Sequence, residues 1–388
     1  MSRFLFVVPP LVGHTMPTVA VGAELADRGH QVAWAAHPET VGPLLPPGAR
    51  LIPVEVDIGG QTPAQLQQHW QGLARVAAFR FLWRDFLLPL ATSMVPGVVA
   101  AVDEFCPDVL VADQQALAGA LVAHQRGLPW ATSASTSSEL TNQFATMPAL
   151  GTWIHQLQTD FQRGFAVPDP VDLRFSDQLV LVFTTEALVG PLGAFPGHYV
   201  FVGPAIGARP RKPAFPWEWL DPTRHHVVVS LGTVNAEAGG RFFTTVLAAA
   251  APLADRLQVI LVAPPDLVGA VGGHVLVREF VPLLDLLPHL DAMVCHAGHN
   301  MVCEALAHKV PLVVAPIRDQ QPVVAGQVVN AGAGVRVHFG RVGADELRNA
   351  ITTVLDDPSY RAAAARVQSS FAAAGGAAAA ADHLEKLA

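Results

Sequence analysis

The chain has 388 residues, more than one hydrophobic core usually organises, so its length predicts two domains of roughly 200 residues each. Hydrophobic residues make up 51% of the sequence and charged residues only 14%, which excludes an intrinsically disordered protein. The formal net charge of -8, without any run of Lys or Arg, argues against a nucleic-acid partner and against an anionic membrane surface.

The apolar stretches and the cysteines predict a cytoplasmic protein. Three prolines interrupt the uncharged N-terminal stretch 4–23, so we do not expect a secretory signal peptide. The longest later candidate, 86–102, contains two prolines and a glycine, so we expect no stable membrane insertion. The three cysteines show no CxxC spacing, which is typical of buried thiols in a reducing compartment: Cys106, Cys295 and Cys303.

The first half of the chain alternates strands and helices. An apolar run at 4–8 is followed by a helical stretch that has Pro17 near its first turn and stops at Gly29, and then by a second apolar run at 31–36. This spacing predicts a βαβ unit and therefore a parallel sheet. The pattern continues with strands at 109–112, 129–133 and 179–183 and a helix at 116–126, so residues 1–204 are expected to form one doubly wound domain.

The second half repeats this alternation after a linker. Five prolines between Gly203 and Pro222 preclude long regular structure, which places a linker at 205–222. Strands are then expected at 226–233, 257–263, 291–295, 311–316 and 334–337, within a second domain at 223–364. The alanine-rich tail, 365–388, predicts a terminal helix weakened at Gly375 and Gly376. The predicted fold is therefore α/β, with two Rossmann-like, doubly wound parallel-sheet domains facing a central cleft.

One strand-to-helix turn in the second half is a candidate anion site. Residues 295–298 end a predicted strand and 300–307 read as a helix, so the backbone N–H groups at the turn can bind a phosphate. His296 can add a charged or neutral hydrogen bond, and Glu304 can accept from ribose hydroxyls. A second phosphate contact is expected at Gly232 and Thr233, because glycine permits close backbone approach and threonine adds a hydroxyl.

The segment HAGHNMVCEALAHKVPLVVAPIRDQQP, which begins at His296, resembles the nucleotide-sugar signature of family 1 glycosyltransferases, a group that includes natural-product and macrolide glycosyltransferases. The resemblance is specific over roughly 60 residues and looser over the whole chain, and it implies the two-domain GT-B fold. It assigns the phosphate and ribose contacts to one turn: His296, Gly298, His299, Asn300, Met301 and Glu304. It also places the nucleobase against the backbone around Phe280 and Val281.

The same resemblance implies a catalytic histidine in the loop after the first strand, where His14 stands, and a partner aspartate, for which Asp113 matches. The chemistry is sound from the residues alone. A hydroxyl group is a poor nucleophile until a base takes its proton, and a carboxylate orients an imidazole and stabilises its cation. We therefore predict that His14 is the base and that Asp113 orients it.

The segment departs from the family pattern at two positions. Met301 stands where Ser or Thr is common, and Gln320 stands where an acidic residue normally precedes Gln321 in the pair that holds the sugar. An amide at Gln320 weakens recognition of a diol, so a deoxysugar donor is a reasonable hypothesis. No D-x-D motif occurs anywhere in the chain, so we expect metal-independent transfer without a cofactor.

Three interpretations remain open beside these. The aromatic residues of 62–88 and the Ser/Thr-rich stretch 132–146 are equally consistent with an acceptor pocket and with core packing plus a polar loop. A zinc site is less well supported, because its residues lack paired spacing: Cys295, His296, His299 and Cys303. Rival functions are a nucleotide-sugar 2-epimerase and an inactive glycosyltransferase-like helper protein.

The sequence thus predicts an inverting glycosyltransferase of natural-product or antibiotic biosynthesis. It would move a sugar from a UDP- or TDP-sugar to a hydroxyl of a hydrophobic small molecule, with His14 as base and the sugar held by Gln320 and Gln321. The base of the nucleotide, the sugar, the acceptor and the oligomeric state stay open, a homodimer among the possibilities.

Overall fold

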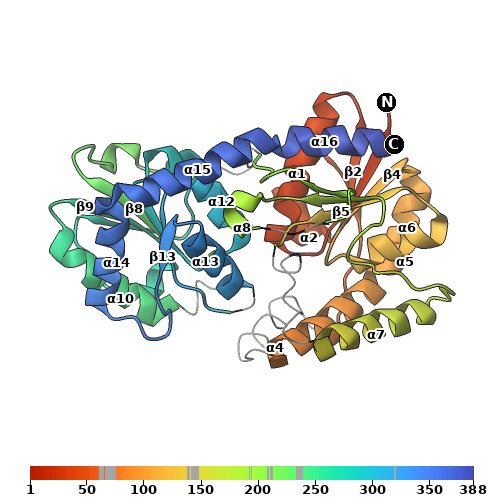
Figure 1. Cartoon of the computed structure of the whole chain (residues 1–388), viewed down its shortest axis with the longest axis horizontal. Helices are drawn as coiled ribbons and strands as arrows, with labels where there is room; N and C mark the ends of the chain where they lie inside the picture. Colours follow the sequence, from red (N-terminus) through yellow and green to blue (C-terminus); the bar gives the residue numbers. More distant parts are fainter. Residues whose placement is uncertain are drawn as a thin grey trace. The chain divides into compact units, whose positions relative to one another are not determined.

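The computed structural model describes residues 1–60, 65, 76–137, 140, 148–191, 193, 195–207, 209, 213–232, 239–318 and 320–388. The chain divides into two compact units, each of which is described separately below (Figure 1). Unit 1 comprises Met1–Thr184, Leu192–Pro210 and Ala374–Ala388. Unit 2 comprises Thr185–Pro191 and Arg211–Ala373.

Unit 1 is built on a seven-stranded parallel sheet with the strand order β3-β2-β1-β4-β5-β6-β7. Its strands are β1 (Arg3–Val7), β2 (Gln31–Ala36), β3 (Arg50–Pro53), β4 (Val109–Asp113), β5 (Trp130–Ala134), β6 (Leu179–Val182) and β7 (Tyr199–Phe201). Five of them lie within one residue of the predicted strands, since apolar runs bounded by Gly and Pro are strong local signals.

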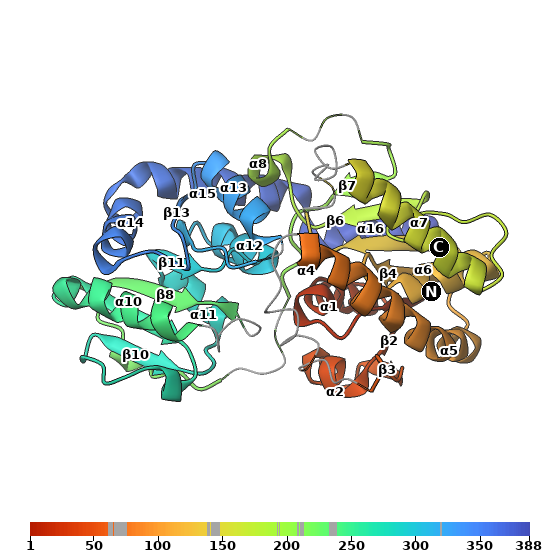
Figure 2. The same cartoon turned by 90° about the horizontal axis from the view of Figure 1, so that it is seen from below.

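Helices cover both faces of this sheet. They are α1 (Val12–Asp27), α2 (Pro38–Val41), α4 (Val76–Arg80), α5 (Leu88–Phe105), α6 (Leu117–Arg126), α7 (Pro148–Gly164) and α16 (Gly376–Leu387), with a 3-10 turn at Gly42–Leu44 and a π-helical segment, η2, at Phe81–Leu87. Side chains alternate along β1: Leu5 packs with α5 and α6, whereas Phe4 packs with α1 and α16. Figure 2 shows α5 and α7 on the same side of the sheet.

One stretch of unit 1, 77–105, is long and apolar enough to cross a membrane by length and composition alone. Half of its most apolar window is buried inside the protein. A core helix of a soluble protein meets the same criterion, because its buried face is equally apolar. The stretch is therefore weak evidence for a membrane span.

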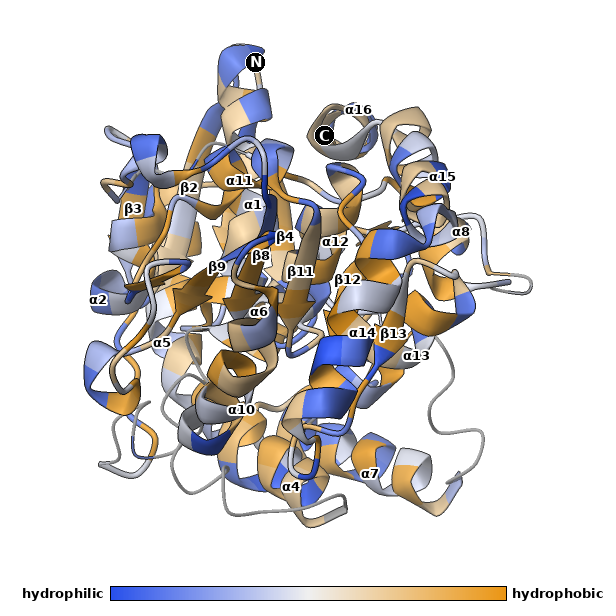
Figure 3. Cartoon of the chain, turned by 90° about the vertical axis from the view of Figure 1, so that its left-hand side faces the viewer, coloured by the Kyte–Doolittle hydropathy of each residue, from blue (hydrophilic) through white to orange (hydrophobic). Residues whose placement is uncertain are grey.

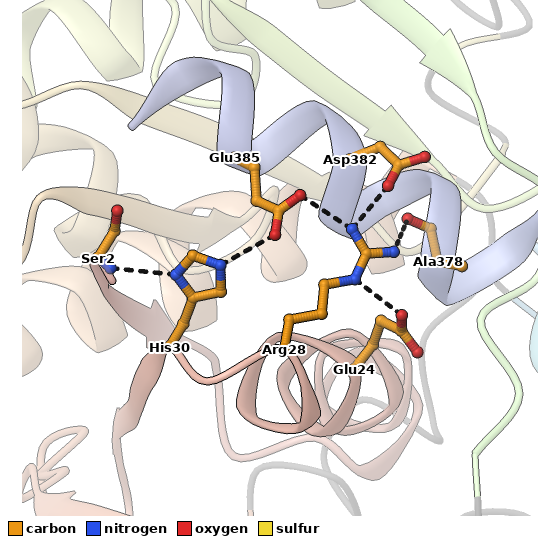
Figure 4. A network of polar contacts seen from close by, with 7 residues as sticks. All are labelled: Ser2, Glu24, Arg28, His30, Ala378, Asp382 and Glu385. Carbon is orange, nitrogen blue, oxygen red and sulfur yellow. Dashed lines mark hydrogen bonds and ion pairs between the residues drawn. The ribbon is translucent and has the colours of Figure 1, made fainter.

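The C-terminal helix α16 belongs to unit 1 and is fastened to α1 by charged side chains (Figure 4). Arg28 donates to Glu24, Asp382 and Glu385 at 2.8, 2.6 and 2.9 Å, and Glu385 also contacts His30 at 2.9 Å. The break before α16 lies at Gly375, which has φ of 88°, as expected from the paired glycines. The predicted boundary at 364 instead falls inside one continuous helix, α15 (Pro358–Ala374).

Unit 2 is built on a six-stranded parallel sheet with the strand order β10-β9-β8-β11-β12-β13. Its strands are β8 (His225–Ser230), β9 (Leu257–Val262), β10 (Val275–Arg278), β11 (Ala292–Cys295), β12 (Leu312–Val314) and β13 (Gly334–Arg336). Figure 3 shows hydrophobic residues concentrated on these strands. Both faces are buried, since Val228 packs in one apolar cluster and its neighbours Val227 and Val229 pack in another.

Along the chain, the helices of unit 2 precede, connect and follow these parallel strands. They are α8 (Glu186–Val189), α10 (Gly240–Ala250), α11 (Leu283–Leu286), α12 (His299–Ala307), α13 (Gln321–Asn330), α14 (Ala344–Asp356) and α15, with 3-10 turns at Trp217–Trp219, Ala251–Leu253, Pro265–Leu267 and Leu287–His289. The short turn at 217–219 lies inside the predicted linker 205–222, whose described residues from 213 onward belong to unit 2. The predicted class, two doubly wound α/β domains, is confirmed.

Candidate functional site

The first group of predicted residues meets at the carboxyl end of the sheet in unit 1. His14 lies in the first turn of α1, just after β1, and Asp113 is the last residue of β4, which pairs with β1. Because both strands are parallel neighbours, the segments that follow them lie side by side. The Nδ1 atom of His14 lies 2.8 Å from the Oδ1 atom of Asp113. The two residues that the sequence predicted as base and orienter are therefore in contact.

The Asp113 carboxylate is enclosed by donors. Its side chain is fully buried, and its Oδ1 atom also accepts from the backbone N–H of Gln115 at 2.9 Å. Its Oδ2 atom accepts from the hydroxyl of Ser135 at 2.6 Å. A buried carboxylate is stable only where such donors replace water, so this arrangement holds Asp113 in one orientation. The His14 side chain keeps 12% of its surface exposed, which leaves it accessible to a substrate.

Ser135 was not predicted as a site residue. It follows β5, the neighbour of β4 on the far side from β1, and its Oγ atom lies 2.8 Å from Nδ1 of His14. In the sequence it is one of several Ser and Thr residues of 132–146. Only the strand order singles it out, since that order places the end of β5 beside the end of β4.

The second group lies in unit 2, at the N-terminus of α12. Helix α12 begins at His299, one residue earlier than predicted, and Gly298 precedes it with extended backbone. Its first turn contains no acidic residue, and α12 follows directly on β11. Backbone N–H groups at a helix start attract an anion, both as donors and through the helix dipole. The geometry fits the predicted phosphate site.

His296 is packed between two glycines. A Cβ atom added at Gly232 would lie 2.7 Å from Cε1 of the His296 ring, and one added at Gly298 would lie 2.6 Å from its Nε2 atom. Gly232 also has a φ of 72°, which side chains disfavour. In the structure Gly232 makes room for the imidazole ring, and the phosphate contact expected at this glycine stays a prediction.

The electrostatic environment keeps His296 neutral near pH 7. The pKa of His296 is lowered to about 4, mainly by burial and also by the nearby positive charge of Arg318, while a backbone hydrogen bond with Ser230 offsets part of this shift. The sequence allowed either a charged or a neutral hydrogen bond from His296. In the protein without ligand the neutral form is favoured. Arg318 was not predicted as a site residue, and its position beside His296 depends on the fold of the loop after β12.

The two glutamines predicted to hold a sugar lie at the start of α13. The Oε1 atom of Gln321 accepts from the backbone N–H groups of Ile317 and Arg318 at 2.8 and 3.1 Å, so it fixes the loop after β12. Its amide nitrogen is the atom left to contact a sugar. Gln320 is the residue before α13, and its backbone carbonyl accepts from the first turn of that helix.

The remaining predicted nucleotide contacts that the structure describes also lie in unit 2. Phe280 follows β10 and is 58% exposed, which suits a stacking platform, whereas Val281 packs partly against the core. Glu304 is buried, and Met301 packs against the same core. The Nε2 atom of His299 lies 3.6 Å from the sulfur of Cys303. Thr233 lies outside the described residues.

The aromatic residues considered for the acceptor pocket are mostly core residues. Phe81, Trp83 and Phe86 are buried within the main apolar cluster of unit 1. Trp70 lies outside the described residues, and Phe79 packs partly against that cluster. For the three buried side chains, core packing is therefore the correct interpretation.

Within the described part of the chain, no group of three or more His, Cys, Asp or Glu side chains is arranged to hold a metal ion. Burial raises the pKa of the Cys295 thiol to about 12 and also raises the pKa of Cys303. Zinc binds the thiolate form, so both cysteines are poor ligands in these surroundings.

Comparison with known proteins gives relatives over the whole chain. Residues 246–387 match the family described as the C-terminal domain of erythromycin biosynthesis protein CIII-like proteins. The 4'-demethylrebeccamycin synthase of Lentzea aerocolonigenes is 30% identical over 421 aligned positions, which cover 100% of this chain and 99% of that protein. The demethyllactenocin mycarosyltransferase of Streptomyces fradiae is 28% identical, over 100% of this chain and 87% of that protein.

Solved structures share the fold over its full length. The calicheamicin glycosyltransferase CalG4 superposes with a TM-score of 0.80 at 21% identity, covering 100% of this chain and 98% of that one. The glycosyltransferase VinC, solved in complex with dTDP, superposes with a TM-score of 0.77 at 20% identity, covering 99% of each chain. At these identities the likeness shows the fold.

Proposed function

Because the chain belongs to the family 1 glycosyltransferases of antibiotic biosynthesis, with the GT-B fold, we propose that it transfers a sugar from a UDP- or TDP-sugar to a hydroxyl of a hydrophobic natural product. Family and fold agree with the resemblance seen in the sequence. The donor, the acceptor and the inverting course of the reaction are the proposed part.

The hydrogen bond between His14 and Asp113 is the single observation that carries this proposal. With Nδ1 of His14 facing Asp113, Nε2 is the ring atom left to take a proton. The acceptor hydroxyl gives its proton to Nε2 as its oxygen bonds to the anomeric carbon, and the bond from that carbon to the diphosphate oxygen breaks. One displacement from the opposite side inverts the configuration, and Asp113 stabilises the imidazolium that forms.

In the proposed reaction the leaving diphosphate is stabilised by unit 2. The backbone N–H groups and the positive dipole end at the start of α12 meet its charge, and neutral His296 donates a hydrogen bond. Glu304 accepts from the ribose, and Phe280 stacks on the base. No divalent ion is needed in this scheme, so we expect activity to survive EDTA.

We propose that the sugar is held by Gln320 and Gln321 and lacks at least one hydroxyl. Two amides recognise a diol less strongly than a carboxylate and an amide do. Two similar proteins are consistent with this donor class, since one is a mycarosyltransferase and VinC was solved with dTDP. Cytoplasmic location, a soluble state and a homodimer remain predictions, which cell fractionation and light scattering can check.

The decisive experiment incubates the protein with paired UDP- and TDP-sugars and a mixed library of hydrophobic aglycones, with and without EDTA. A mass gain equal to one sugar on an aglycone supports the proposal and identifies the sugar class. Conversion of the donor without any acceptor would instead indicate the 2-epimerase. Absence of nucleotide binding would indicate the helper protein.

A further inference from the structure

Ser135 touches both members of the proposed catalytic pair. Its Oγ atom lies 2.6 Å from Oδ2 of Asp113 and 2.8 Å from Nδ1 of His14, and Nδ1 itself lies 2.8 Å from Oδ1 of Asp113. The three side chains therefore form a closed ring of contacts at the ends of β1, β4 and β5. Only 2% of the Ser135 surface is exposed, so water does not compete for its hydroxyl.

Only one placement of the protons satisfies all three contacts. A carboxylate accepts hydrogen bonds and does not donate them, so the proton between His14 and Asp113 must sit on Nδ1. The single hydroxyl proton of Ser135 must point to Oδ2 of Asp113, the shorter of its two contacts. The Ser135 oxygen then accepts a share of the Nδ1 proton of His14. If the hydroxyl proton pointed to Nδ1 instead, Nδ1 would have to be unprotonated. Nδ1 would then face Oδ1 of Asp113, and Oγ of Ser135 would face Oδ2, with no proton in either contact.

The loop that carries Ser135 is itself fixed. The side chain of Gln114 donates to Oγ1 of Thr136 at 2.8 Å and accepts from its backbone N–H at 3.3 Å. The backbone N–H of Ser135 donates to the carbonyl of Ser133 at 3.1 Å. The loop after β5 is thereby fastened to the loop after β4, and the Ser135 hydroxyl stays aligned.

We propose that Ser135 is a positioning residue that locks His14 in the tautomer protonated at Nδ1, so that Nε2 keeps the lone pair that the acceptor hydroxyl requires. This role rests on the proposed function only for its catalytic consequence. Without the hydroxyl, Oδ2 of Asp113 loses its donor and the carboxylate can turn. The imidazole then samples the tautomer protonated at Nε2, which cannot act as a base toward the acceptor.

The first test measures the tautomer directly. The full chain is labelled with ¹⁵N-histidine, and the His14 signals are assigned by their loss in His14→Gln. We expect the wild-type spectrum to show Nδ1 protonated and Nε2 unprotonated, and we expect Ser135→Ala to add the other tautomer. A wild-type His14 protonated at Nε2 would overturn the proposal, and this measurement needs neither a substrate nor a variant at position 135.

The second test is kinetic. A hydrogen bond to a charged group contributes about 1.5 to 3 kcal/mol, so Ser135→Ala should lower kcat about tenfold to a hundredfold, with the donor KM changed less than about twofold. Ser135→Thr, which keeps a hydroxyl, should recover most of this loss. Ser133→Ala is the matched control, because Ser133 is equally buried and its hydroxyl has no hydrogen-bond partner among the described residues. Its kcat should stay within about twofold of wild type.

The outcomes separate the two proposals. Unchanged kcat and tautomer in a folded Ser135→Ala, together with an inactive His14→Ala, would reject the role of Ser135 and keep the transferase reaction. A tautomer shift in Ser135→Ala without sugar transfer to any aglycone would support the positioning role and reject the proposed reaction.

Discussion

The residues of the two candidate sites are held in place by different kinds of contact. In unit 1, His14, Asp113 and Ser135 hold one another through side-chain hydrogen bonds of 2.6 to 2.8 Å. In unit 2, the site is made of backbone N–H groups at the start of α12 and of a histidine ring held between two glycines. The first site depends on hydrogen bonds between side chains, and the second depends on glycines, whose lack of a side chain leaves room for the histidine ring.

The proposed chemistry explains this difference. A general base must present one lone pair in one direction, which requires a fixed tautomer and therefore specific partners. A leaving diphosphate spreads its charge over several oxygens, so backbone dipoles that are already ordered can stabilise it at little cost. Truncating a side chain should therefore disrupt the site of unit 1, whereas adding a methyl group to a glycine should disrupt the site of unit 2.

The largest expected effect comes from removing the base. His14→Ala should lower kcat by about 10² to 10⁴, because the acceptor hydroxyl then loses its proton acceptor. Binding of UDP or TDP should be unchanged, since the proposed nucleotide contacts lie in unit 2. Steady-state kinetics and calorimetry measure the two quantities. Turnover that survives in His14→Ala would remove this histidine from the mechanism.

A pH dependence is expected of unit 2. The pKa of His296 is about 4 in the folded protein, mainly because of burial, and an unfolded histidine titrates near its ordinary value of 6.5. Between these values the unfolded chain binds more protons, so the stabilising effect of neutral His296 is complete above pH 6.5 and is lost as the pH falls toward 4. The loss is at most about 3 kcal/mol.

Urea unfolding of the full chain at pH 7, 5.5 and 4.5 measures this loss. Since other groups also titrate, the comparison is with His296→Gln, in which the slope between pH 6.5 and 4 should be smaller. Parallel pH profiles of the two proteins would contradict the assignment. Arg318→Gln should raise the pKa of His296, because a nearby positive charge is removed.

A third prediction tests the glycines of unit 2. Gly298→Ala places a Cβ atom 2.6 Å from the His296 ring, so the ring or the start of α12 must move. We expect a destabilisation of about 1 to 3 kcal/mol and weaker UDP or TDP binding. Gly343→Ala is the matched control, because Gly343 also precedes a helix, α14, in extended conformation and an added Cβ atom meets nothing within 4 Å. Equal effects in both variants would show that the ring contact is unimportant.

The smallest effect is expected at the charged contacts between α1 and α16. Arg28 holds the pKa of Asp382 below its usual range, and His30 does so for Glu385. Asp382 is exposed and its partners lie partly exposed at the surface, so water and salt screen these charges and the change in overall stability should be slight. Arg28→Gln should speed amide hydrogen exchange in 376–387 without changing kcat. Lys386→Gln, an exposed change on the same helix, should leave that exchange unchanged.

The fold was predictable where its signals are local. Strands such as 31–36 and 257–262 are apolar runs bounded by turn residues, and parallel strands are apolar on both faces, so their ends follow from composition. The break at Gly375 also follows from local backbone freedom. The domain boundary predicted at 364 instead falls inside α15, because alanines favour helix on both sides of residue 364 and only packing decides which residues share a unit.

For the site, the sequence by itself determined His14, Asp113 and the start of α12, because each lies directly after a strand and parallel strands direct such residues to one edge. The tertiary structure alone decided the contacts of Ser135, the charge that Arg318 places beside His296, and the use of Gln321 to hold a loop. These contacts depend on which strands are neighbours and how loops pack, and residues far apart in sequence carry no local signal of that arrangement.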